Sequence, residues 1–318
     1  MTTFPKKKIA IIGECMIELS GQPFSTQEQR FGGDTLNTAL YMSRLSPTIH
    51  TAYVTAIGVD NYSQHMKLAW EGEGINCSLV LTNKDKLPAL YAIELSPEGE
   101  RSFQYWRNDS AARYLCQHER YNEVIQSLTD YDLVYLSGIS LAILPECDKQ
   151  TLLDSIKKLK AHGVKVAVDS NYRPRLWSGT EHAQEWLEKL YQIADIALVT
   201  CEDESLLLGK DLSPEYLTER LCDFGVSQVV VKLGKDGAMF SDVNHQFQLA
   251  KGHVVTNVVD TTAAGDSFNA GFLSAWAAGH TLRECCHWGN KLAAEVIQHK
   301  GAIIPQENTT YITSLLNL

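Results

Sequence analysis

Short apolar runs with the length of buried strands alternate along this chain with longer amphipathic segments of helical periodicity. The strand-like runs lie at 8–13, 51–58, 133–138, 164–169, 196–200 and 229–232, and the helix-like segments at 34–45, 61–73, 148–162, 181–193, 202–208, 213–224, 266–278 and 282–299. This order predicts an α/β fold with a mostly parallel sheet wrapped by helices. Ligands of such folds bind beyond the carboxyl ends of the strands, so the residues after each strand are candidates for function.

Two segments interrupt the alternation. Residues 87–107 contain two β-like runs around the turn Ser96-Pro97-Glu98-Gly99, with no helix between them. With residues from about 14 to 30, this hairpin is expected to form a small antiparallel lid over the open end of the sheet, excluding water from a reaction site. An ordinary edge hairpin is the alternative. No repeat or linker is found, so we expect a single domain over 1–318, with the lid from roughly 14–30 and 87–110.

The composition narrows the class of protein. The 318 residues are 44% hydrophobic, which suffices for a large core, and their net charge of -10 disfavours nucleic acid as a partner. The chain has eight cysteines. No two of them form a CxxC pair, and no histidine lies at metal-ligand spacing, so neither a disulfide framework nor a zinc site is expected. Neither a signal sequence nor a run of about 20 apolar residues occurs. We therefore expect a cytoplasmic protein with no membrane partner.

The segment 259–272 carries the strongest indication of chemistry. Small residues run directly into Asp266 and then into an apolar, helix-like stretch. The backbone N–H groups of Ala263, Ala264 and Gly265 can therefore converge at a helix N-terminus, where they suit a phosphate. A carboxylate beside such an anion hole fits transfer of a phosphoryl group to a hydroxyl, with Asp266 as the base. The alternative is a helix cap of small residues followed by an ordinary acidic first turn.

The common phosphate motifs are absent, since neither GxxxxGK[ST] nor GxGxxG occurs in the chain. A different glycine-containing loop follows the strand-like run 229–232 and comprises Lys232, Leu233, Gly234, Lys235, Asp236 and Gly237. Its glycines permit close backbone approach, and its lysines can meet a polyphosphate. The same pattern is also typical of a hairpin turn, which is the alternative.

Two further places can hold a polar substrate. A glycine pair precedes a predicted helix whose first turn carries Asp34 and Asn37. Polar groups at this position can reach the hydroxyls of a sugar. The alternative is that Asp34 only caps the helix N-terminus. Arg107 ends the expected lid and Arg173 follows the run 164–169. Arginine grips a planar carboxylate with paired hydrogen bonds, although each of these two residues could instead make a surface ion pair.

These motifs together resemble the PfkB/ribokinase family of carbohydrate kinases, over nearly the whole chain from Ile9–Leu19 to Gly301–Pro305. Tyr105–Asn108 and Asn171–Trp177 resemble its keto-deoxy-acid branch. The resemblance implies a ribokinase-like fold. It also implies phosphorylation, by ATP with a divalent ion such as Mg2+, of the terminal (C6) hydroxyl of a 2-dehydro-3-deoxy sugar acid, releasing ADP.

The resemblance also assigns roles to residues, with Asp266 as the base. The implied substrate site comprises Gly33, Asp34, Thr35, Leu36, Asn37, Tyr91, Tyr105, Trp106, Arg107, Arg173 and Asp266. The implied nucleotide site comprises Asn171, Tyr172, Arg173, Lys232, Leu233, Gly234, Lys235, Asp236 and Gly237, with Ala263, Ala264 and Gly265 as the anion hole. Glu204 is the implied metal residue, directly or through water.

Two positions depart from the family pattern. Ala263 replaces the first glycine of the usual Gly-Ala-Gly-Asp motif, which is harmless at negative φ and costly at positive φ. Cys201 replaces the asparagine of an Asn-x-x-Glu motif and is a poor ligand for a hard cation. Glu204 could equally belong to an acidic first helical turn.

Two other functions stay open. One is a kinase of the same family for a neutral sugar such as fructose or ribose, for which paired arginines would serve no purpose. The other is a non-catalytic sensor of a sugar acid, which would tolerate Asp266→Asn. In each case the partners are small molecules, and we expect a homo-oligomer.

Overall fold

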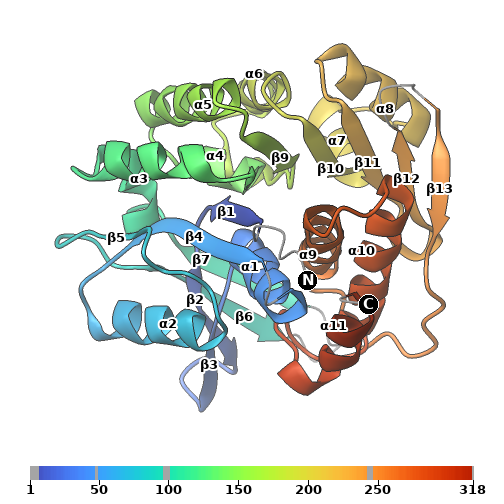
Figure 1. The fold of residues 1–318 in the computed structure, drawn as a ribbon. Helices are drawn as coiled ribbons and strands as arrows, with labels where there is room; N and C mark the ends of the chain where they lie inside the picture. Colours follow the sequence, from blue (N-terminus) through green and yellow to red (C-terminus); the bar gives the residue numbers. More distant parts are fainter. Residues whose placement is uncertain (1–6, 47–48, 96–100, 242–245, 317–318) are drawn as a thin grey trace, which may run out of the picture.

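The computed structural model of the protein describes residues 7–46, 49–95, 101–241 and 246–316, so the expected turn at 96–99 lies outside the described residues. A nine-stranded sheet runs through the body in the order β13-β12-β11-β10-β9-β8-β1-β4-β5 (Figure 1). Its strands are β1 (Lys8–Ile12), β4 (His50–Ile57), β5 (Val80–Thr82), β8 (Leu133–Ser137), β9 (Lys165–Asp169), β10 (Ile196–Thr200), β11 (Gln228–Lys232), β12 (Gly237–Ser241) and β13 (Gln248–Lys251). All neighbours are parallel except at β12 and β13.

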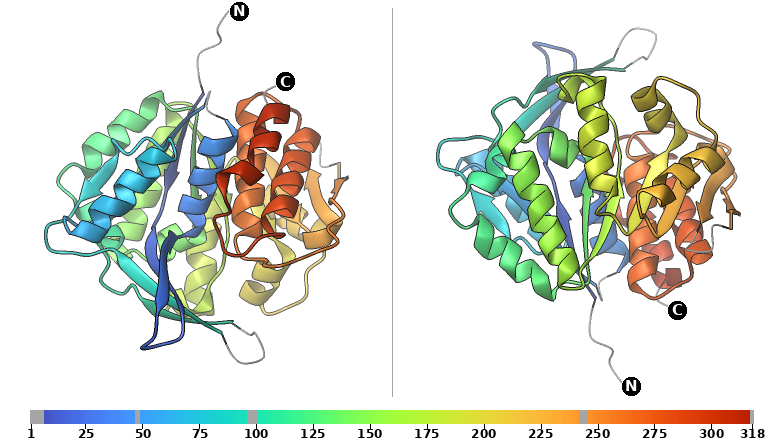
Figure 2. Two further views of the ribbon diagram at one scale, coloured as in Figure 1. Left: turned by 90° about the horizontal axis from the view of Figure 1, so that it is seen from below. Right: turned by 90° about the horizontal axis from the view of Figure 1, so that it is seen from above.

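Helices cover both faces of this sheet because its strands are apolar on both sides. In β1, Ile9 and Ile11 belong to one buried cluster, whereas Ala10 and Ile12 belong to the other. The first cluster packs under α1 (Asp34–Leu45), α2 (Asn61–Gly72), α9 (Ala264–Ala277), α10 (Leu282–Val296) and α11 (Thr310–Leu316). The second packs under α3 (Tyr121–Ser127), α4 (Gly138–Ala142), α5 (Glu146–Ala161), α6 (Thr180–Tyr191), α7 (Cys201–Leu208) and α8 (Pro214–Asp223), as Figures 1 and 2 show.

A second, four-stranded sheet projects from the body (Figure 2). It contains β2 (Met16–Gly21), β3 (Gln27–Gly32), β6 (Ala89–Leu95) and β7 (Arg101–Trp106) in the order β3-β2-β6-β7. The two outer pairs are antiparallel, as expected of a lid, but the central pair β2–β6 is parallel. Both central strands follow parallel strands of the main sheet, β1 and β5, and therefore leave the body in the same direction.

The predicted strands and helices are all present, and α1 has the predicted bounds. The prediction missed the short or edge elements β5, β12, β13, α3, α4 and α11. The loop after β11 forms a hairpin connection, because β11 and β12 pair antiparallel around a 3-10 turn at Gly234–Asp236. Within the described ranges, no helix combines the length and apolar character needed to cross a bilayer.

Candidate active site

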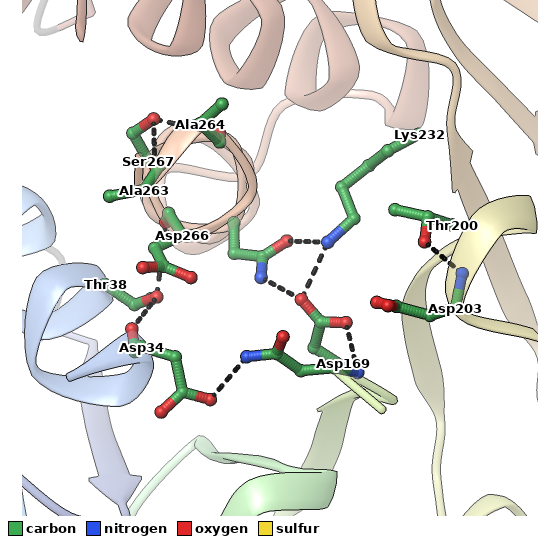
Figure 3. Close-up of polar contacts among 12 residues, drawn as sticks. Asp34, Thr38, Asp169, Thr200, Asp203, Lys232, Ala263, Ala264, Asp266 and Ser267 are labelled. Carbon is green, nitrogen blue, oxygen red and sulfur yellow. Dashed lines mark hydrogen bonds and ion pairs between the residues drawn. The ribbon is translucent and has the colours of Figure 1, made fainter. Parts of the chain in front are cut away.

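Asp266 lies in the first turn of α9 with its carboxylate turned toward α1 (Figure 3). Its Oδ2 accepts a hydrogen bond from Nδ2 of Asn37 at 2.8 Å. Its backbone carbonyl accepts another from the hydroxyl of Thr38 at 3.2 Å. The two helices thus hold the carboxylate at one position, on the side of the sheet where the strands end.

Backbone N–H groups are available beside this carboxylate. The hydrogen-bond ladder of α9 begins where the N–H of Ser267 donates to the carbonyl of Ala263 at 2.9 Å, and the N–H of Ala264 donates to Thr261 at 3.2 Å. No acceptor in the described part of the chain engages the N–H groups of Gly265 and Asp266. These two groups are therefore left to bind an anion at the positive end of the helix.

Ala263 adopts a left-handed backbone conformation, with φ 60° and ψ 16°. Alanine in place of the family's glycine was expected to be harmless at negative φ and costly at positive φ, and the structure shows the costly case. A β-carbon in the left-handed region costs about 1 kcal/mol. Strain of this kind tends to persist where the surrounding structure requires it, and here it turns the chain into the helix beside Asp266.

The environment of Asp266 favours its protonated form. Burial raises the pKa of this carboxyl above its usual range, and the charge of Asp34 raises the pKa further. The hydrogen bond from Asn37 and the charge of Lys232 act in the opposite direction, because both stabilise the carboxylate. A raised pKa suits a group that must accept a proton near neutral pH.

A buried ion pair lies next to the N-terminus of α9. The Nζ of Lys232, at the end of β11, lies 2.7 Å from Oδ2 of Asp169, at the end of β9 (Figure 3). Asn269, one helical turn after Asp266, donates to the same oxygen at 2.7 Å and accepts from Lys232 at 3.3 Å. A β-carbon placed on Gly265 would lie 3.5 Å from this ammonium, so Lys232 stands beside the anion-binding corner.

Helix α1 presents only part of the expected substrate segment to the site. Asp34 accepts a hydrogen bond from Nδ2 of Asn171 at 2.8 Å, and Asn37 contacts Asp266. Thr35 and Leu36 are fully buried in the interior, where Thr35 hydrogen-bonds Tyr53. Their side chains thus pack into the interior, and a role for them in substrate binding stays a prediction. Gly33 is needed because a β-carbon there would lie 2.3 Å from the carbonyl of Glu14.

The lid residues divide between its two faces. Tyr91 and Tyr105 are cross-strand partners with stacked rings 5.9 Å apart, and Tyr91 donates its hydroxyl to Glu18. Arg107 lies with its guanidinium carbon 5.8 Å from the ring of Tyr105. Trp106 points to the opposite face, since side chains alternate along a strand, and is 61% exposed.

The two arginines expected to share a carboxylate pair with different acidic residues in this structure. Arg107 pairs with Glu14, which follows β1, whereas Arg173 pairs with Asp203 at 3.2 Å beside β10. Arg173 is also half-exposed. Of the neighbouring residues expected to bind the nucleotide, Asn171 contacts Asp34, and Tyr172 is buried in the core under α6.

Glu204 is fully buried and accepts a hydrogen bond from the hydroxyl of Tyr191. Burial raises its pKa to about 7. The carboxyl of Glu204 is thus engaged in the interior, and its role in metal binding stays a prediction. Within the described ranges, no group of three or more His, Cys, Asp or Glu residues is arranged to hold a metal ion.

The loop after β11 is exposed at Gly234, Lys235 and Asp236, whereas Lys232 is turned inward to Asp169. Leu233 donates its N–H to the carbonyl of Gly237 at 2.8 Å, which closes the hairpin. Gly237 has φ 103° and no room for a side chain, because a β-carbon would lie 2.1 Å from the carbonyl of Ala250. The segment thus forms a hairpin turn, and its exposed residues leave a role in nucleotide binding open as a prediction.

Several polar residues of this site were not predicted from the sequence. They are Glu14, Glu18, Thr38, Asp169 and Asn269. Two signals were present: Asp169 ends a strand-like run, and Asn269 follows Asp266 by three positions and so shares its helix face.

Residues 6–309 match the profile of the pfkB family carbohydrate kinases, so the protein belongs to this family. Among its relatives, the 2-dehydro-3-deoxygluconokinase of Haemophilus influenzae is 48% identical over 98% of this chain and 100% of that protein. The enzyme of the same name from Escherichia coli K12 is 42% identical over 95% of this chain and 98% of its own.

Solved structures show the same fold. The 2-dehydro-3-deoxygluconokinase of Thermotoga maritima superposes with a TM-score of 0.82 at 20% identity, covering 97% of this chain and 99% of that chain. A fructokinase from Vibrio cholerae, solved with fructose, ADP and a potassium ion, superposes with a TM-score of 0.83 at 22% identity over 99% of both chains. The chain therefore has the ribokinase-like fold expected from its motifs.

Proposed function

We propose that this protein phosphorylates the C6 hydroxyl of 2-dehydro-3-deoxy-D-gluconate with ATP, giving 6-phospho-2-dehydro-3-deoxygluconate and ADP. The observation that carries the reaction type is Asp266, a carboxylate of raised pKa beside the free N–H groups of an α-helix. The choice of substrate is supported by relatives of that name, which are 42–48% identical over nearly the whole chain.

The geometry suits an in-line transfer. Asp266 accepts the proton from the substrate hydroxyl as its oxygen bonds to the γ-phosphorus of ATP, and the bond from that phosphorus to the bridging oxygen of ADP breaks. The N–H groups of Gly265 and Asp266 stabilise the charge on the transferring group. Lys232, held by Asp169 and Asn269, adds a fixed positive charge beside them.

A divalent cation fits this site as a companion of ATP. Asp34, Asp169, Asp203 and Asp266 all come from the strand ends and helix starts that Figure 3 shows, and a polyphosphate beside them needs charge compensation. Mg2+ is usually held by substrate phosphates, waters and one or two carboxylates. We propose Asp203 for this role, because Asp169 is buried against Lys232 and Glu204 is buried against Tyr191.

Phosphorylation of a neutral sugar is the second candidate, and the relatives support it less. Arg107 pairs with Glu14, so binding of an acid would depend on the donors that this pair leaves free rather than on excess positive charge. The third candidate is a sugar-acid sensor without catalysis. It differs from the two kinases because a sensor would keep its function in Asp266→Asn. Use of magnesium, a homo-oligomeric state and a cytoplasmic location stay predictions.

ADP release with a panel of acceptors tests the proposal. The panel contains 2-dehydro-3-deoxygluconate, its galactonate epimer, gluconate, fructose and ribose. We expect efficient turnover of the keto-deoxy acids only. Equal turnover of fructose would favour the neutral-sugar alternative, and no turnover of any acceptor would favour the sensor.

A further inference from the structure

Glu14 lies at the junction between the main sheet and the lid, directly after β1 and Gly13 and two residues before β2. Its side chain is 1% exposed. Because a buried carboxylate without partners is strongly destabilising, its contacts indicate what the residue is there to hold.

Three donors converge on this carboxylate. Nε of Arg107 donates to Oε2 at 3.0 Å, Nη2 of Arg107 donates to the same oxygen, and the hydroxyl of Ser110 donates to Oε1. Arg107 itself is 9% exposed at its side chain. The ring of Tyr105 lies beside the guanidinium, which is thereby restrained on a second side.

This arrangement leaves one end of the guanidinium for a ligand. Arginine has five N–H donors, and the described contacts of Arg107 use Nε and Nη2. Nη1, for which the described part of the chain offers no hydrogen bond, is the remaining group. Tyr91 and Tyr105 lie on the same lid face as Glu18. Glu18, but neither tyrosine, borders a hollow of about 130 Å³ between the lid and the loops that carry Asp260 and Gly301.

We propose that Glu14 is a positioning residue that sets the specificity for a sugar acid by fixing Arg107 with Nη1 toward the substrate carboxylate. This inference rests on the proposed function. Since the Glu14–Arg107 pair is neutral overall, recognition of the acid depends on the orientation of the donor more than on excess positive charge. Glu14 does not contact the substrate, so its effect passes through Arg107.

Two substitutions separate orientation from charge. Glu14→Gln keeps an oxygen for both donors of Arg107 and places an amide N–H against the hydroxyl oxygen of Ser110, so the geometry survives while the negative charge is lost. Glu14→Ala removes both. Ser110→Ala removes one hydrogen bond to Glu14 and leaves both hydrogen bonds from Arg107 in place. Its effect on the KM should therefore be intermediate, and it disturbs the fold less than Glu14→Ala.

The experiment measures kcat, the KM for 2-dehydro-3-deoxygluconate and the KM for ATP. We expect Glu14→Ala to raise the sugar-acid KM roughly 10- to 100-fold, with the ATP KM within about twofold. Glu14→Gln should stay within about threefold of the wild type or bind the acid more tightly, and Ser110→Ala should raise this KM by about two- to fivefold. The double variant Glu14→Ala/Arg107→Ala should be no weaker for the acid than Arg107→Ala alone.

Additive losses in the double variant would overturn the inference, as would equal changes in both KM values or an unchanged KM in Glu14→Ala. If Glu14→Ala does not fold, the decision passes to Glu14→Gln and Ser110→Ala. A sugar-acid KM that Glu14→Gln raises beyond about threefold, or that Ser110→Ala leaves unchanged, would then overturn the inference. Failure of the proposed function looks different, because the wild-type protein would then not turn over the acid at all.

Discussion

Nδ2 of Asn37 donates a hydrogen bond to Oδ2 of Asp266 at 2.8 Å, across 229 positions of sequence. This contact joins the first turn of α1 to the first turn of α9 and stabilises the charged form of Asp266. It opposes the burial and the charge of Asp34, both of which raise the pKa of that carboxyl.

Asn37→Ala should therefore raise the pKa of Asp266 further. Because a base acts only when ionised, the acid limb of the kcat/KM profile should move to higher pH, with about a tenfold loss near pH 6 and a smaller loss above pH 8. Asp34→Asn removes a like charge and should move the limb the opposite way. Limbs that move together, or not at all, would contradict this account.

The strained backbone of Ala263 gives a stability prediction. Ala263→Gly should raise the free energy of unfolding by about 0.5–1 kcal/mol, because relief of the left-handed strain exceeds the entropy that glycine adds to the unfolded chain. Urea unfolding measures this change. Ala264→Gly, at a helical position, is the matched control and should lower the stability. A destabilised Ala263→Gly would mean that the conformation carries no strain.

The ion pair of Lys232 and Asp169 should be costly to break from one side. Lys232→Met leaves a buried carboxylate without its cation and should destabilise the protein by about 3 kcal/mol in urea unfolding. The double variant Lys232→Met/Asp169→Asn should recover part of this loss, because it removes the uncompensated charge. Equal losses in the two variants would show that the pair matters only through its packing.

Glu204 predicts a pH dependence of stability. Its pKa is raised from 4.5 to about 7 in the folded protein, so the folded state binds the proton more tightly than the unfolded state. The contribution of Glu204 to stability should therefore fall by about 3 kcal/mol as the pH rises from 4.5 to 7. Glu204→Gln should remove this contribution and leave the part of the pH dependence that comes from Asp266, whose pKa is also raised.

The exposed Glu202 on the same helix provides the control, since Glu202→Gln should leave the pH dependence unchanged. A metal titration supplies a second readout. The concentration of Mg2+ needed for half-maximal activity should change little in Glu204→Gln, whereas a large increase would restore Glu204 as a metal residue.

The sequence was sufficient to predict which segments reach the site but not which side chains face it. Asp34, Asn37 and Thr38 lie on the face of α1 that meets the site, whereas Thr35 and Leu36, between them in sequence, face the core. Helical periodicity explains this division once the helix is placed against the sheet. A motif read as consecutive residues cannot show it.

Contacts between distant segments were beyond prediction for a different reason. The pairing of Arg107 with Glu14 depends on how the lid folds back on the sheet, and nothing local to either residue specifies it. The positive φ of Ala263 was likewise not predictable, since alanine by itself favours negative φ. The alternation of strands and helices along the chain, in contrast, follows from patterns that each segment carries.

The central claim is that Asp266 takes the proton from the acceptor hydroxyl, and turnover by Asp266→Asn tests it most directly. With ATP, Mg2+ and 2-dehydro-3-deoxygluconate, we expect kcat to fall by about 10²–10⁴-fold while the substrate still binds and the fold is kept. An Asp266→Asn enzyme with wild-type kcat at neutral pH would contradict the account.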